Sequence, residues 1–264
     1  MADIALDKDG QPITASWLAS SLGLDATTGE TLTYIPAEES TVRGPHSATV
    51  RLDLSGCRDA PRSVFLKRVV PADLSQRSPD KWLRDAASYR SEINFSRLWV
   101  PLLAEKGVRL PAIHATVAEG VAGLSVLLKE GDGAAPADER ILATVSACKF
   151  LILSEDLQNS YGQKMLLDRG DMGAVLSMLA SFHAATFDDQ ELLGRAEAEL
   201  FSSGAYWSPA QRPPAELEKL PEVWAAFCGE FESTDPALFA EDGVKALGGR
   251  LQRSAAAVSE SLRG

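Results

Sequence analysis

The chain has 264 residues, and its 26 Lys and Arg against 37 Asp and Glu give a formal net charge of −11. An acidic surface repels phosphodiester backbones and anionic lipids, so we expect neither nucleic-acid binding nor basic docking to membranes. With 45% hydrophobic and 24% charged residues, the composition is that of a folded globular protein and excludes a chain disordered throughout.

The three cysteines, Cys57, Cys148 and Cys228, lie far apart and form no C-x-x-C pair, which favours a reducing compartment. No cysteine and histidine spacing indicates a structural zinc. The first ten residues carry acid where a signal peptide needs base, and no apolar run approaches the ~20 residues that span a bilayer. We therefore expect a cytoplasmic protein without a membrane segment.

The first predicted element is a short helix over residues 13–22, which Thr14 or Ser16 can cap. We interpret it as a lid or as an N-terminal appendage. Apolar residues then alternate over 31–35, 47–55 and 63–70, with turn formers between these runs. This pattern predicts three antiparallel strands, the third of which buries Val64 and Leu66 or their alternates.

A long helix is predicted over residues 80–106, because apolar residues recur there at three- and four-residue steps and glycine is absent until its end. Pro101 is expected to kink or end this helix. Residues 110–119 and 123–131 are predicted as strands, and 131–139 as a loop rich in turn formers.

The apolar run from Lys149 to Leu153 predicts a strand buried on both faces. Beyond it the pattern becomes helical, beginning with a helix capped by Asp168 or Asp171. Helical spacing also recurs in three later segments: 189–200, 216–232 and the tail from 242.

These elements predict an α+β protein in three parts. Residues 1–28 form an N-terminal helical appendage, residues 29–157 a lobe with a sheet and one long helix, and residues 158–264 a helical part.

Three acidic and basic features of the first lobe follow one another in an informative order. Lys67 lies in the middle of the third strand, and a lysine on a buried strand needs a carboxylate or phosphate partner. Glu92 is the only glutamate between Lys67 and Glu105, and Glu155-Asp156 ends the buried strand. We expect Lys67 to pair with Glu92 and to hold nucleotide phosphates, while the backbone after the buried strand meets the adenine.

Four segments resemble the choline kinase-like and ecdysteroid kinase-like phosphotransferases, which are related to the aminoglycoside phosphotransferases. They are SVFLKRV, SYRSEINFSRLW, FLILSEDL and LASFHAATF. The resemblance implies a bilobal protein-kinase-like fold that transfers the γ-phosphate of ATP to a hydroxyl of a small acceptor. It also implies Lys67 on the phosphates, Glu92 as its partner, Glu155, Asp156 and Leu157 at the adenine, and Mg²⁺ in the complete family fold.

The sequence departs from that family in its phosphate loop and catalytic loop. The turn STVRGPHSATV contains Gly44 alone where kinases have a glycine-rich loop. The chain has two asparagines, Asn94 and Asn159. Five residues before them stand Tyr89 and Ser154, so no D-x-x-x-x-N motif occurs. No histidine begins an HGD, and Arg169-Gly170-Asp171 precedes LASFHAATF, which favours a helix cap. We therefore assign no catalytic residue and no magnesium ligand.

Three functional hypotheses remain open. The chain is a fragment of a small-molecule phosphotransferase that ends before the catalytic loop and is inactive alone, or it is a non-catalytic nucleotide-binding or interaction module. The third is an unrelated α+β binding protein in which Lys67 has no ligand role.

Several other residues have two possible roles. His183 is expected to be a packed core histidine. His46, in the candidate phosphate loop, either contacts a phosphate or, as we favour, is an exposed loop residue. The aromatic and acidic stretch from Tyr206 to Phe231 is either part of an acceptor pocket or, as we favour, a set of helix contacts made by Trp207, Trp224 and Phe227.

Overall fold

The computed structural model describes residues 5–7, 9–24, 31–43, 47–69, 78–129, 138–158, 161–162, 164–200 and 214–261. The chain separates into two compact units, Met1–Leu200 and Phe201–Gly264. Both predicted boundaries, after residues 28 and 157, lie inside the first unit.

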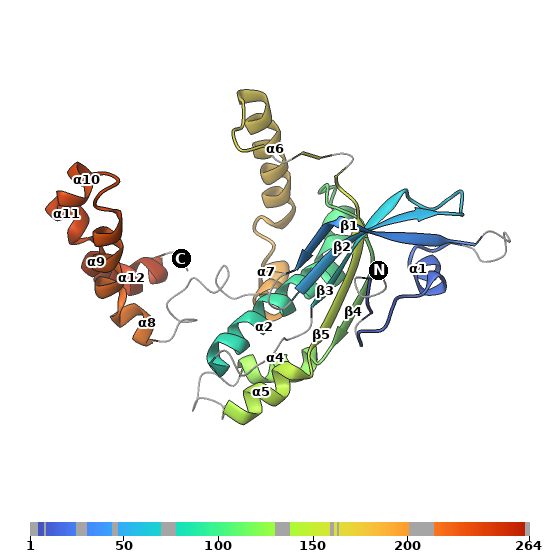
Figure 1. Ribbon diagram of the computed structural model, residues 1–264, viewed down its shortest axis with the longest axis horizontal. Helices are drawn as coiled ribbons and strands as arrows, with labels where there is room; N and C mark the ends of the chain where they lie inside the picture. The colour runs from blue at the N-terminus through green and yellow to red at the C-terminus, as the bar shows by residue number, and fades with distance from the viewer. Residues whose placement is uncertain are drawn as a thin grey trace. The chain divides into compact units, whose positions relative to one another are not determined.

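A five-stranded antiparallel sheet forms the centre of the first unit (Figure 1). Its strands, in the order β1-β2-β3-β5-β4, are β1 (Thr33–Arg43), β2 (Ser47–Ser55), β3 (Ser63–Val69), β4 (Ile113–Glu119) and β5 (Lys149–Glu155). The predicted α+β class and the predicted meander of the first three strands are confirmed. β1 starts two residues later than the predicted run 31–35 and extends much farther, to Arg43.

The alternating pattern correctly identifies the buried face of the meander. Val50 and Leu52 of β2 and Val64 and Leu66 of β3 have at most 1% of their surface exposed. β5 lies between β3 and β4, so it has neighbours on both sides. Its residues 150–153 are all buried, as predicted for a strand covered on both faces.

Helix α1 (Ala15–Ser21) begins at Thr14, whose hydroxyl accepts a hydrogen bond from the backbone N–H of Trp17. Its Leu18 is completely buried and packs with Leu66 and Leu153 in one cluster. The helix therefore covers the Leu66 face of the sheet and is part of the core, not a lid over the opposite face.

The predicted long helix is irregular in its middle. α2 (Pro79–Asn94) continues into a π-helical turn, η3 (Phe95–Trp99), and then into α3 (Val100–Glu105). The N–H of Val100 donates to the carbonyl of Phe95, a π-type bond. Pro101 explains the irregularity, because it has no N–H and its ring displaces the carbonyl of Arg97, four residues earlier.

The prediction of a strand over 123–131 is wrong. These residues lie mostly in a helix, α4 (Val121–Lys129), in which Leu124 and Leu127 are buried three residues apart. A short apolar run is compatible with either a buried strand or a buried helix. Here other elements cover only one side of the run, and its leucines have a high helix propensity, so the helix is favoured. A second helix that we did not predict, α5 (Asp138–Ser146), packs Ile141 and Val145 against the same cluster. The predicted loop lies outside the described residues except for its last two, which begin α5.

Helix α6 (Arg169–Thr186) begins as the sequence predicts. Asp168 and Asp171 form a capping box, since each carboxylate accepts a hydrogen bond from the other residue's backbone N–H. The triplet Arg169-Gly170-Asp171 is thus a helix start. α7 (Gln190–Glu199) follows, with Asp189 as its N-cap.

The expectation for His183 is wrong, because this residue is exposed and α6 has no buried residue. Its ring makes an edge contact with Phe182 at 6.1 Å between centroids. Within α6, Phe182 and Ala185 pack against the small apolar cluster around Trp99. The apolar spacing of the helix therefore does not correspond to a buried face within this unit.

The second unit is helical. Its elements are α8 (Pro214–Glu218), α9 (Leu220–Phe231), α10 (Pro236–Ala240), α11 (Asp242–Lys245) and α12 (Leu247–Ser261). Trp224 stacks on Phe227 at 5.4 Å and donates from its indole N–H to the carbonyl of Val244. A Cβ at Gly248 would lie 2.5 Å from that of Trp224, so this glycine permits the close approach of α12 to α9. The helix-packing role of Trp224 and Phe227 is confirmed, while Trp207 lies outside the described residues.

Among the helices of the described ranges, none is long and apolar enough to cross a membrane.

Candidate functional site

Lys67 projects from the face of the sheet opposite the Leu66 cluster, because successive residues of a strand point to opposite sides. Its cross-strand partners are Thr49 on β2 and Ile152 on β5. Phe65, two residues earlier, lies on the same face and is half-buried. This part of the sheet therefore places the Lys67 ammonium among polar and apolar neighbours, with a second cation, Arg51, opposite Phe65 on β2.

Helix α2 brings Glu92 to Lys67. The helix buries Trp82, Ala86 and Ile93 against the sheet, which places its last turns over the Lys67 face. The Lys67 ammonium donates to both carboxylate oxygens of Glu92, at 2.5 and 2.8 Å. The side chains keep 29% and 39% of their surface exposed, so the pair is accessible to solvent.

The segment after β5 lies farther along the same strands. The register pairs Lys67 with Ile152 and Val64 with Glu155, so Glu155 lies three residues, or about 10 Å, along the sheet from Lys67. The Oε2 atom of Glu155 accepts a hydrogen bond from the backbone N–H of Ala112, at 3.1 Å. Its own N–H donates to the carbonyl of Ala112. Glu155 thereby joins the start of β4 to the end of β5.

Asp156 is occupied by a buried network of its own. Its side chain is only 2% exposed. It accepts hydrogen bonds from the hydroxyl of Ser63 and the N–H of Gln158, and it forms a 3.1 Å ion pair with Arg51. These contacts fix the backbone after β5, so any ligand contact of this segment would use backbone groups of Asp156 and Leu157.

His114 of β4 is half-buried near this segment. Burial lowers the pKa of its imidazole below the ordinary 6.5, and the negative charge of Glu155 opposes that shift without cancelling it. The imidazole is therefore predominantly neutral at physiological pH.

Other predicted features lie elsewhere or outside the described residues. Gly44 and His46 of the candidate phosphate loop lie outside them. No three His, Cys, Asp or Glu side chains gather to hold a metal ion in the part of the chain that the structure describes. Cys148 is a core residue, and burial raises the pKa of its thiol to about 11.

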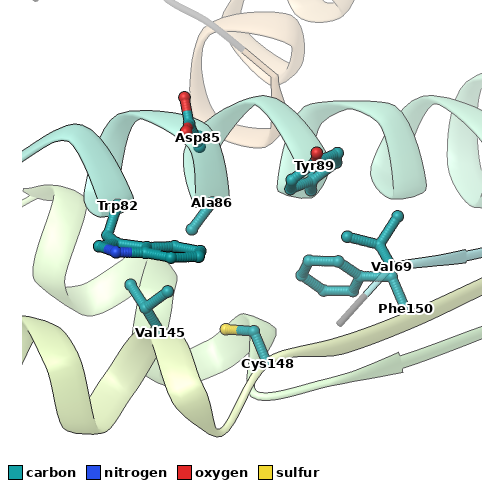
Figure 2. A pocket seen from close by; sticks show the side chains of 8 residues that line it. All are labelled: Val69, Trp82, Asp85, Ala86, Tyr89, Val145, Cys148 and Phe150. Atoms are coloured by element: carbon teal, nitrogen blue, oxygen red, sulfur yellow. The ribbon is translucent and has the colours of Figure 1, made fainter. Parts of the chain in front are cut away.

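A small apolar hollow lies beneath α2, at the end of the sheet opposite Glu155 (Figure 2). The Asp85 carboxylate points away from it. Its lining comes from α2, the strand ends and α5: Val69, Trp82, Asp85, Ala86, Tyr89, Val145, Cys148 and Phe150. Neither Lys67 nor Glu92 lines this hollow, so it is separate from the ion pair.

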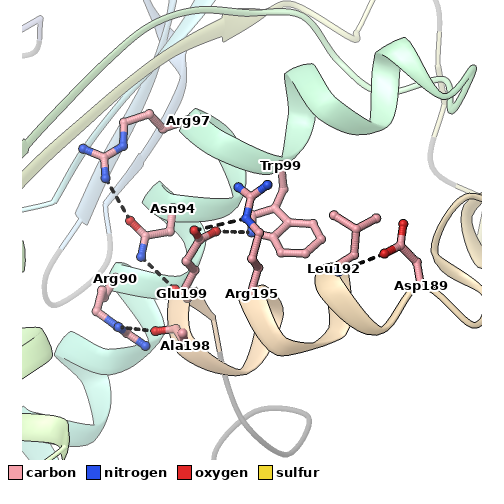
Figure 3. Close-up of polar contacts among 9 residues, drawn as sticks. All are labelled: Arg90, Asn94, Arg97, Trp99, Asp189, Leu192, Arg195, Ala198 and Glu199. Carbon is pink, nitrogen blue, oxygen red and sulfur yellow. Dashed lines mark hydrogen bonds and ion pairs between the residues drawn. The ribbon is translucent and has the colours of Figure 1, made fainter.

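Sequence reasoning missed the side chains that hold this region together. Arg51 and Ser63 surround Asp156, and Arg90 and Asn94 of α2 bind the end of α7 (Figure 3). The one available signal was the position of Arg90 and Asn94 at i and i+4 of a helix predicted to pack on a sheet, where polar residues on the covered side need partners.

Comparison of the chain with protein-family models, with curated proteins and with solved structures finds no match.

Proposed function

We propose that the first unit binds ATP in the manner of the kinase-like small-molecule phosphotransferases, with Lys67 on the phosphates and Glu92 as its partner. The observation that carries the proposal is the bidentate pair between a lysine of the third strand and a glutamate of the following helix. In protein kinases an ion pair of this kind places the lysine for phosphate binding.

The accessibility of the pair supports this proposal. An ammonium group has three N–H donors, and Glu92 uses two of them. Among the described residues, Lys67 makes no other hydrogen bond, so its third N–H can donate to a phosphate oxygen. The chain carries a net charge of −11, and a polyphosphate therefore needs such a local cation.

The arrangement of the sheet gives further support. Phe65 and Ser154 pair across β3 and β5 on the same face as Lys67, between the ammonium and the segment after β5. A base lying against Phe65 would meet the backbone after Glu155 at one end and direct its phosphates toward Lys67 at the other. The buried Asp156 network makes that backbone rigid.

We propose binding without turnover for these 264 residues. Phosphoryl transfer depends on a catalytic base and on Mg²⁺ that neutralises the developing charge. The sequence contains no D-x-x-x-x-N, and the described residues include no acidic cluster suited to the metal. The residues therefore do not fit a magnesium site. The small acceptor expected from the resemblance has no assigned residues.

Direct titration with ATP tests the proposal. We expect saturable binding to the full chain by calorimetry, and Lys67→Met should weaken it about tenfold or more because a charge-assisted hydrogen bond to phosphate is lost. Lys149→Met is the matched control, since Lys149 is also half-exposed and paired, with Asp9 at 2.7 Å, but projects from the opposite face.

Two results would overturn the proposal: no binding at millimolar ATP, or equal affinities for the wild type and Lys67→Met. Either would favour the unrelated α+β binding protein. Magnesium-dependent consumption of ATP by the purified chain would contradict the expected lack of turnover.

A further inference from the structure

The C-terminal end of α7 is held by two side chains of α2. The last carbonyls of a helix lack partners within it and need other donors. Arg90 donates through Nη1 to the carbonyl of Ala198 at 3.2 Å and through Nη2 to that of Leu200 at 2.6 Å. Asn94 donates through Nδ2 to the carbonyl of Glu199 at 2.7 Å (Figure 3). Three consecutive carbonyls are therefore bound from one side of α2.

Both donors are buried, with 7% of Arg90 and 5% of Asn94 exposed. Burial lowers the pKa of the Arg90 guanidinium below its ordinary value. Such burial is unfavourable without partners, and the partners here are the negative end of a helix dipole and the hydroxyl of Ser125 on α4. Because these donors are buried, water cannot replace their carbonyl partners, and the contact fixes α2 relative to α7.

A second set of contacts fixes α7 along the rest of this helical segment. The indole N–H of Trp99 donates to Oε2 of Glu199 at 2.9 Å, and the Arg195 guanidinium lies 5.8 Å from the centre of the Trp99 ring. At the start of α7, Asp189 pairs with Lys106 at 3.2 Å. The Lys106 contact lies far along the chain from Glu92, which makes it a useful control.

The position of Glu92 on α2 connects this contact to the candidate site. Arg90 and Asn94 are four residues apart and share one side of the helix. Glu92 is two residues from each, so it is rotated by about 200° and points the opposite way. One side of α2 therefore binds the end of α7 while the other brings Glu92 to Lys67.

We propose that Arg90 and Asn94 are positioning residues of the Lys67 site: by binding the end of α7 they hold α2 in the rotation that pairs Glu92 with Lys67. The role in ligand binding rests on the proposed function, whereas the effect on the Lys67–Glu92 pair does not. Loss of these contacts should free Lys67 even when no nucleotide is present.

The experiment measures the acylation rate of Lys67 by an amine-reactive ester, read by mass spectrometry on the full chain without nucleotide. An ammonium that donates two hydrogen bonds must release them before it reacts. We expect Arg90→Met to raise the acylation rate of Lys67 about fivefold or more, a factor at the lower end of those found for coupling between sites. The reference variant Glu92→Gln, which weakens the ion pair directly, should raise the rate in the same way. Arg90→Lys should restore part of the protection.

Lys149 is the internal standard, since its pair with Asp9 would also open if the variant loosened the whole unit. Lys106→Met is the matched control, because it removes a contact at the other end of α7, and we expect it to leave the Lys67 rate unchanged. If Arg90→Met does not fold, Asn94→Ala is the variant that tests the inference. We expect it to raise the acylation rate of Lys67 about twofold, because one hydrogen bond to α7 is lost.

The outcomes separate this inference from the proposed function. An unchanged Lys67 rate in folded Asn94→Ala and Arg90→Met, or an equal rise at Lys149, overturns the inference. A selective rise at Lys67 supports it, and it does so even if no variant binds ATP, a result that would overturn the proposed function alone. A selective rise together with weaker ATP binding supports both.

Discussion

The two faces of the sheet differ in what covers them. On one face Leu66 is packed beneath α1 with the fully buried Leu18. On the other, α2 covers Val69 and Phe150 but leaves Lys67 accessible. Adjacent residues of β3 thus contribute to the core and to the candidate site, because side chains alternate across a strand. Stability and ligand binding should therefore separate between neighbouring positions.

The sharpest test of that separation compares Leu66→Ala with Lys67→Met. We expect Leu66→Ala to lower the free energy of unfolding by about 2–5 kcal/mol, because it leaves a cavity at a residue that is 1% exposed. Lys67→Met should change it by less than about 1 kcal/mol, as partly exposed ion pairs contribute little. Chemical denaturation measures both. Similar losses at the two positions would refute the comparison.

The next test concerns adjacent residues after β5. Asp156→Asn should lower the unfolding free energy by about 1–3 kcal/mol, because it removes the charge that partners the half-buried Arg51 and disturbs the bond from Ser63. Glu155→Gln should cost about 0.5 kcal/mol or less, since the amide can still accept from Ala112. Denaturant titration of both variants checks this order, and a larger loss for Glu155→Gln would contradict it.

The smallest expected effect is the pH dependence that His114 introduces. Its pKa in the folded state is lowered from 6.5 by burial, so below pH about 6.5 the unfolded chain binds more protons. The His114 contribution to stability is therefore complete above that pH and is lost as the pH falls through this range. His114→Gln should flatten the stability profile between pH 5 and about 7. An unaltered profile would show that His114 is not the titrating group.

Much of the first unit was predictable, since its signals are local. Alternation located β2 and β3 almost to the residue, and the spacing of Asp168 and Asp171 identified the start of α6. The order of Lys67 and Glu92 indicated their pairing, because a lysine on a covered strand needs a carboxylate and Glu92 is the only glutamate of the next helix.

The wrong predictions concern segments whose structure or burial depends on which other elements pack against them. Residues 123–131 read equally well as a buried strand, until α5 is known to pack against one side of them. His183 lies in an apolar pattern that predicts a core face, yet α6 has no buried residue within its unit. A local pattern states which residues prefer burial but does not identify what covers them.

The sequence alone determined the class of the fold, the alternation of β2 and β3, the helix caps and the pairing of Lys67 with Glu92. Only the tertiary structure decided which face α1 covers, that Asp156 is enclosed by Arg51, and that Arg90 and Asn94 bind carbonyls more than 100 residues away. The physical reason is one of range. Strand alternation and capping depend on near neighbours in the chain, whereas buried polar groups take whichever partners the packing of distant elements brings to them.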